Sequence, residues 1–291
     1  MLTIVGSASL CVVCLIFSGS TVAQSSAHPA PAKARGGTTT PAAAAQGQGD
    51  VANAKDVIRN VKAAQYNLPK QGMQSFRCSI AIDWDGMYKQ LGADGDVART
   101  TLALLDKTRF EGVVGPGGSI SLSHESDEPP PNGEISERLK RSEDGADEMI
   151  TGLFKTWAGF MVGSMFPNPD EEYHLKLSGG EYQLTYGAEG TTIQVEFNSI
   201  LKMERFSYTA SEIKADFKLA FEPDPKGFVL SAYTAAIDSP NSNVPKRFDV
   251  SIENQMVNGL MLPHVAVARI PSKDSTVALQ MTFSDFQVTK K

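Results

Sequence analysis

Nine consecutive segments with the pattern of β-strands occupy the chain from residue 172 almost to its C-terminal end, and they limit the fold more than any other feature of the sequence. Within residues 247–253, Phe248, Val250 and Ile252 alternate with polar side chains, and short turns such as Asn258-Gly259 separate neighbouring segments. Consecutive strands joined by short turns pair antiparallel, so the sequence predicts an antiparallel meander. The nine segments are residues 172–178, 181–187, 191–197, 202–208, 213–222, 227–236, 246–256, 262–269 and 276–288.

The chain between residues 50 and 123 predicts a mixture of helices and strands. Asp50 is expected to cap a short helix over residues 51–61, where apolar side chains recur at helical spacing. Residues 73–84 alternate as one half-buried strand, and residues 109–123 form a hairpin around a Gly-Pro-Gly-Gly turn. Residues 85–105 read as a helix that its two central glycines can split. Together with the meander, these elements predict the α+β fold class.

A long helix over about residues 134–166 is predicted next, as an insertion in a single α+β domain of residues 50–291. Its first half is charged and its second half, from Met149 on, is apolar nearly all round, so more than one neighbour must cover it. Lys155 and three glycines make a membrane-spanning role a poor fit. The large apolar side chains are candidates for the lining of a ligand groove, with plain core packing as the alternative; they are Met149, Phe154, Trp157, Phe160, Met161 and Phe166.

The N-terminal 23 residues have the composition of a secretory signal peptide. They contain no acidic or basic side chain, an apolar stretch runs from Leu10 to Phe17, and Thr21-Val22-Ala23 has the small-x-small form that a signal peptidase cleaves. We therefore expect cleavage after Ala23 and export to the periplasm or the extracellular space, without a stable membrane span in the mature protein. A basic region before the apolar stretch is missing, and the alternative is a retained membrane anchor.

Residues 24–49 separate this segment from the folded body. Ala, Gly and Pro make up 15 of their 26 residues, and no apolar periodicity is present, so they are predicted to be a disordered spacer. From Asp50 onward the chain has 25 basic and 33 acidic side chains, a balance of −8. Nucleic-acid binding normally requires a clustered basic excess, so no nucleic-acid partner is expected. The sequence carries no signal for an oligomeric state.

Motifs that would indicate catalysis or metal binding are few. Cys78 is the last cysteine left after cleavage and lies in an alternating apolar run, so it reads as a small buried hydrophobe. No two histidines have metal-ligand spacing, and we expect neither a metal nor a cofactor. Asp83 and Asp85 flank Trp84 and could face a glycosidase-like cleft, although Asp85 capping the next helix is the simpler interpretation. The protein is therefore expected not to be an enzyme.

Two short runs resemble a known family. The helix that ends near Val61 is followed by a strand over residues 73–82. Late in the chain, Asn258-Gly259-Leu260-Met261-Leu262-Pro263-His264-Val265-Ala266-Val267 resembles a G-x-x-L-P-x-x-V run. Element order and these runs resemble the periplasmic lipoprotein carrier and receptor (LolA/LolB-like) superfamily. The resemblance implies a strongly curved antiparallel sheet, a half-barrel whose concave apolar side is closed by helices. The lipidation cysteine of the receptor branch is absent, and the segment 134–166 is larger than the resemblance implies.

These observations predict an exported non-enzymatic protein that binds an apolar ligand, a lipid or an acyl chain, or a lipidated partner protein, in a concave sheet. Two other classes stay open. One is a periplasmic or envelope scaffold that binds a protein partner and no ligand. The other is a glycosidase-like hydrolase that uses Asp83 and Asp85.

Overall fold

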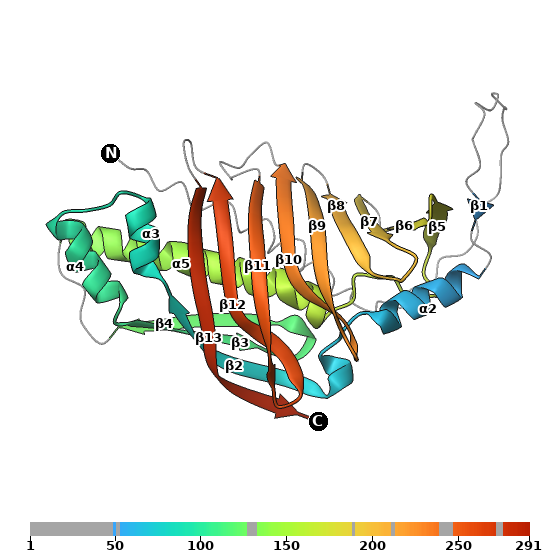
Figure 1. The fold of residues 1–291 in the computed structure, drawn as a ribbon, viewed down its shortest axis with the longest axis horizontal. Helices are drawn as coiled ribbons and strands as arrows, with labels where there is room; N and C mark the ends of the chain where they lie inside the picture. The colour runs from blue at the N-terminus through green and yellow to red at the C-terminus, as the bar shows by residue number, and fades with distance from the viewer. Residues whose placement is uncertain are drawn as a thin grey trace, which may run out of the picture.

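The computed structural model describes residues 49–50, 53–126, 133–187, 190–210, 213–238, 247–271 and 276–291, with the backbone alone for residues 49–50. The predicted signal peptide, residues 1–23, lies outside these residues, and so does the predicted spacer apart from Gly49. The described chain forms one large antiparallel sheet with four helices (Figure 1).

The sheet follows the predicted strand pattern closely. Each of the nine segments predicted from residue 172 onward is a strand, and the ends of all nine lie within two residues of the prediction. The strands are β1 (Gly49–Asp50), β2 (Met73–Ile82), β3 (Thr108–Val114), β4 (Ile120–Ser126), β5 (Tyr173–Ser178), β6 (Glu181–Tyr186), β7 (Thr191–Phe197), β8 (Met203–Ala210), β9 (Ile213–Asp224), β10 (Gly227–Asp238), β11 (Arg247–Val257), β12 (Leu260–Pro271) and β13 (Thr276–Lys290). The α+β class and the antiparallel meander are therefore confirmed.

Strand order shows how the N-terminal strands join the meander. The sheet runs β1-β5-β6-β7-β8-β9-β10-β11-β12-β13-β2-β3-β4, so the last strand of the chain pairs with β2. Met281 lies opposite Ile82 in this antiparallel pair, and the register shifts between Ser284 and Gln287, where Asp285 has a positive φ of 52°. The irregularity bends the strand at the junction, because a bulge increases local twist. In Figure 1, β2, β3 and β4 accordingly run across the direction of β10 to β12.

The expected half-barrel is wrong: the sheet is neither closed nor strongly curled. Its edges, β1 with β5 at one end and β4 at the other, do not pair with each other. The longest helix supplies a physical reason. At 28 residues, α5 (Glu134–Met161) is roughly 42 Å long at 1.5 Å per residue, and it lies across several strands rather than plugging a narrow barrel (Figure 1). A long, straight helix covers the face of an open sheet along its whole length, so the sheet need not curl to bury that face.

The shorter helices begin and end where glycines and caps allow. The predicted helix 85–105 is split into α3 (Trp84–Gln90) and α4 (Asp96–Leu105), separated by Gly92 and Gly95 with φ of 60° and 91°. The first helix, α2 (Ala54–Ala64), begins three residues later than predicted, and Asn53 rather than Asp50 precedes it. Two single turns, η1 (Pro69–Gln71) and η2 (Pro116–Gly118), complete the fold; η2 is the predicted Gly-Pro-Gly-Gly turn between β3 and β4.

The apolar half of α5 forms the centre of the core. From Ile150 to Val162 every side chain is buried except the half-buried Thr151 and Lys155, which confirms that the segment is covered on more than one side. The meander covers one side and the β3–η2–β4 hairpin lies against another. Helix α5 ends at Met161, five residues before the predicted end, because the N–H groups of Val162 and Gly163 both bond to the carbonyl of Ala158. No helix among the described residues is long and apolar enough to cross a membrane.

Candidate functional site

Four of the six candidate lining residues pack in the core or against it, away from any cavity wall described below. Phe154 lies against Phe283 and Phe76, with ring centroids 5.4 and 6.2 Å apart, and Trp157 lies against Phe76 at 5.8 Å. Met161 is fully buried, and its sulfur accepts a hydrogen bond from the backbone of Leu230 at 3.5 Å. Met149 is half-buried and packs against the core. These four residues do not border the cavity described below.

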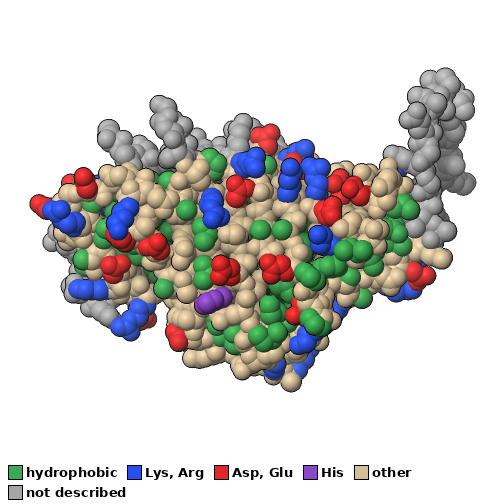
Figure 2. All heavy atoms as spheres, in the orientation of Figure 1, with side chains coloured by type: hydrophobic (Ala, Val, Ile, Leu, Met, Phe, Trp, Pro, Cys, Tyr) green, Lys and Arg blue, Asp and Glu red, His purple; other side chains and the backbone are tan. Residues whose placement is uncertain are grey.

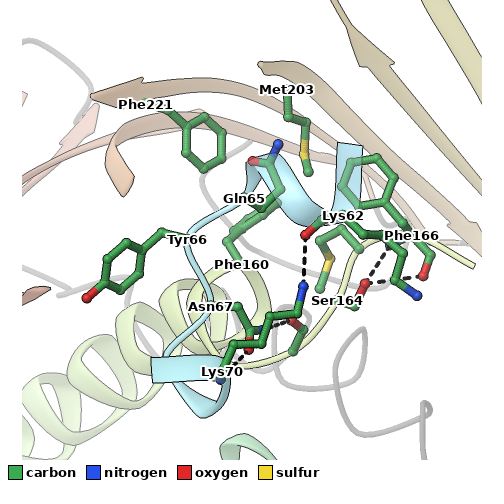
Figure 3. A pocket seen from close by; sticks show the side chains of 12 residues that line it. Lys62, Gln65, Tyr66, Asn67, Lys70, Phe160, Ser164, Phe166, Met203 and Phe221 are labelled. Carbon is green, nitrogen blue, oxygen red and sulfur yellow. Dashed lines mark hydrogen bonds between the residues drawn. The ribbon is translucent and has the colours of Figure 1, made fainter. Parts of the chain in front are cut away.

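Phe160 and Phe166, the other two candidates, border a cavity of about 60 Å³ at the C-terminal end of α5. The cavity lies between the end of α2, the chain that follows α5, and strands β8 and β9 (Figure 3). A single water needs about 10–15 Å³ measured in this way, so the space holds a few waters or the end of an apolar chain. It does not hold a whole lipid without movement of its walls.

The inner wall of the cavity is aromatic and sulfur-rich. The ring of Phe160 lies 5.8 Å from Phe206 and 6.4 Å from Phe221, edge to face, which is a favourable arrangement for aromatic pairs. Met203 and Met165 contribute two thioethers, and methionine side chains adapt readily to the shape of a ligand. The wall therefore suits an apolar group, and it can deform to admit one.

The segment that follows α2 fixes the opposite wall. The amide of Leu68 donates to the carbonyl of Met161 at 2.9 Å, and the side chain of Asn67 donates to the carbonyls of Val162 and Gly163 at 3.2 and 3.0 Å. These carbonyls belong to the end of α5, where a helix leaves its last acceptors without partners. The α2–η1 connection thus satisfies the end of α5 and holds it in place beside the cavity.

Two tyrosines near the cavity form hydrogen bonds that link neighbouring elements. The hydroxyl of Tyr186 donates to the carbonyl of Met165 at 2.7 Å, and the hydroxyl of Tyr66 accepts from the backbone of Met261 at 3.0 Å. Burial raises the pKa of both phenols above its ordinary value, so both stay neutral near pH 7. They position backbone and carry no charge into the cavity.

Gln65 brings an unsatisfied polar atom to the cavity lining. Its side-chain N–H group donates to the carbonyls of Leu201 at 2.9 Å and Val61 at 3.3 Å, while its buried Oε1 has no hydrogen-bond partner. A buried acceptor without a donor is costly, on the order of 1–3 kcal/mol. A water or a ligand hydroxyl in the cavity would relieve that cost.

Two lysines lie at the rim. Lys62, near the end of α2, donates to the carbonyl of Pro167 at 3.3 Å, and Lys70, in η1, donates to the carbonyl of Lys62 at 3.1 Å. Figure 3 shows Lys70 on the side of the cavity away from Met203 and Phe221. The site therefore combines an apolar interior with a basic rim. The rim could not be predicted from the sequence, because neither lysine belongs to a motif.

The other residues considered from the sequence have structural roles. Asp83, not Asp85, caps α3: its Oδ1 accepts from the backbone of Gly86 at 2.9 Å. Asp85 is exposed and pairs with Lys89 at 2.5 Å, and neither carboxylate borders the nearby hollow of about 560 Å³ that Trp84 lines. Cys78 is fully buried, as expected, and burial raises the pKa of its thiol to about 12. Within the described residues no group of three His, Cys, Asp or Glu side chains could hold a metal ion.

No family model and no curated protein sequence matches this chain. The resemblance to the lipoprotein carrier superfamily thus stays an expectation drawn from two short runs and the element order. The ligand-binding role of Phe160 and Phe166 likewise stays a prediction.

Proposed function

We propose that the protein is exported, acts without catalysing a reaction, and binds an apolar chain at the C-terminal end of α5. The chain is that of a lipid or an acyl group, free or attached to a partner protein. The observation that supports this proposal is the cavity of about 60 Å³, where two of the six candidate residues meet Met203 and Phe221. Apolar pockets with a few polar groups at the edge are the usual form of small-molecule sites.

The binding mode follows from the size of the cavity. The end of the chain enters between Phe160 and Phe166, and the side chains of Met165 and Met203 change rotamer to admit more of it. The buried rings of Phe154 and Trp157 stay in place, since both pack against Phe76 of β2. The site is thus one end of α5 rather than the whole groove beneath it.

Native mass spectrometry of the mature protein, with solvent extraction of bound material, tests this proposal. The informative variant is Met165→Trp, which fills the cavity from a half-buried position, and the matched control is Met256→Trp at an exposed position on β11. We expect the wild type and the control to carry an extractable apolar chain and Met165→Trp to lose it. An equal load in all three proteins, or no uptake of offered lipids by the wild type, would overturn the proposal.

A second candidate function is an envelope scaffold that binds a protein and no ligand. The tight packing of Phe154 and Trp157 favours it, because most apolar side chains in the second half of α5 are already buried within the fold. Co-purification of a stable partner with an unloaded wild-type protein would be its signature.

A further inference from the structure

The two lysines at the cavity rim have no carboxylate partner among the described residues. Neither Lys62 nor Lys70 forms an ion pair, although the chain from Asp50 onward carries a net charge of −8. Some other lysines are paired: Lys55, Lys89 and Lys140 each lie within 2.9 Å of a carboxylate oxygen. What sets Lys62 and Lys70 apart is their place: both border the cavity, and no carboxylate is among the described residues that line it.

Capping of α5 does not account for the position of Lys62 and Lys70. Lysines near a helix end often bond its last carbonyls, but here Leu68 and Asn67 take the carbonyls of Met161, Val162 and Gly163. Lys62 donates instead to the carbonyl of Pro167, beyond the end of α5, and Lys70 donates to the carbonyl of Lys62 in the last turn of α2. Each ammonium has three donors, so one bond apiece leaves two donors free on each side chain.

We infer that the apolar chain bound at this site carries an anionic head group, and that Lys62 and Lys70 bind that group at the cavity rim. This inference rests on the proposed function. An apolar tail enters between Phe160 and Phe166, and the carboxylate or phosphate that ends the molecule lies at the rim, where flexible lysine stems follow it. The ligand class is a single-chain acidic amphiphile.

Chains of equal length with different head groups test the inference. Dodecanoate, dodecyl phosphate and dodecanol are titrated into the delipidated full-length mature protein at low salt, with binding followed by calorimetry. Exposed ion pairs contribute up to about 1 kcal/mol each, so two of them correspond to a preference of up to roughly 30-fold for the anionic chains over dodecanol. That preference should shrink as salt rises, because exposed charges are screened. Carboxylate and phosphate forms of the head group are told apart by the first two titrations.

Paired variants separate charge from structure. Lys62→Gln with Lys70→Gln should bring both anionic chains to the affinity of dodecanol and leave dodecanol unchanged, whereas Lys62→Arg with Lys70→Arg should keep the preference. The matched control is Lys218→Gln with Lys226→Gln, which removes the same charge away from the cavity lining from two lysines that likewise form no ion pair with a described residue. Equal binding of all three chains, unaffected by the glutamine pair, would overturn the inference and leave the proposed function standing. Failure of the wild type to bind any of the three would remove the proposed function and the inference together.

Discussion

Two parts of α5 have similar apolar composition and different surroundings. Around Phe154 and Trp157 the helix packs closely against β2, β3 and β13, while a cavity lies beside Phe160 and beside Phe166, which follows the end of the helix. In the first part, strand β3 approaches the helix closely: a Cβ atom placed on Gly112 of β3 would lie 2.6 Å from the ring of Phe154. The second part faces the α2–η1 connection, which the amide of Leu68 and the side chain of Asn67 hold to backbone carbonyls. The side chains there do not fill the space, and a cavity remains. Close packing and open space along one helix thus depend on its neighbours and not on its own residues.

The largest expected effect is at the packed part. Trp157→Ala should lower the free energy of unfolding by roughly 3–5 kcal/mol, because a side chain with 1% exposure leaves a cavity in a close-packed core. Trp157→Phe is the matched variant: the indole N–H is buried without a partner, so losing it should cost less than about 1.5 kcal/mol. Urea unfolding measures both. Equal losses for Trp157→Ala and Trp157→Phe would contradict the packing described here.

Gly112→Ala sharpens the same comparison. The added methyl group meets the Phe154 ring and should destabilise the protein by about 1–3 kcal/mol, the usual cost of overpacking. Gly145→Ala is the control in α5, since nothing lies within 4 Å of its Cβ position and alanine is the better helix former. We expect that control to be neutral or slightly stabilising in the same urea titrations. A tolerated Gly112→Ala would mean that the β3 contact is loose.

Asn67→Ala tests the second part, the C-terminal end of α5 beside the cavity. Its amide binds two carbonyls at the end of α5, and their loss should cost about 1–2 kcal/mol. Hydrogen exchange should rise selectively in the last turn of α5, where the carbonyls lose their donors, and stay unchanged around Ile150. Uniform acceleration along α5 would show that the two parts open together.

The smallest effect is expected at Cys78 near neutral pH. Because burial raises the pKa of this thiol to about 12 while the unfolded thiol titrates near 9, the folded state favours the neutral form. The stability that this difference contributes is fully present below pH 9 and is lost as pH rises from 9 to 12. Cys78→Ala should therefore flatten that alkaline decline relative to the wild type. At pH 8 the native thiol should react with iodoacetamide far more slowly than the thiol of the urea-unfolded protein.

Much of the fold could be predicted because it is local. Period-two alternation in β11, punctuated by turn residues, specifies a half-buried strand without reference to its partner, and Gly92 and Gly95 mark the break between α3 and α4 by themselves. The cavity could not be predicted in this way. Lys62, Gln65 and Met203 lie far apart in the sequence, and no spacing rule connects them. The nearest sequence signal was the row of six large apolar side chains, which contained Phe160 and Phe166 together with four residues that do not border the cavity.

The sequence by itself determined that residues from 172 onward form antiparallel strands and that the second half of α5 must be buried on several sides. Both conclusions depend on which side chains follow one another, since alternation and an all-apolar helix have a single favourable environment each. The tertiary structure alone decided that β13 pairs with β2, that the sheet stays open, and that a cavity with a basic rim remains at one end of α5. These depend on distances between residues far apart in the chain, and on how completely neighbouring elements fill the space between them, which no local pattern specifies.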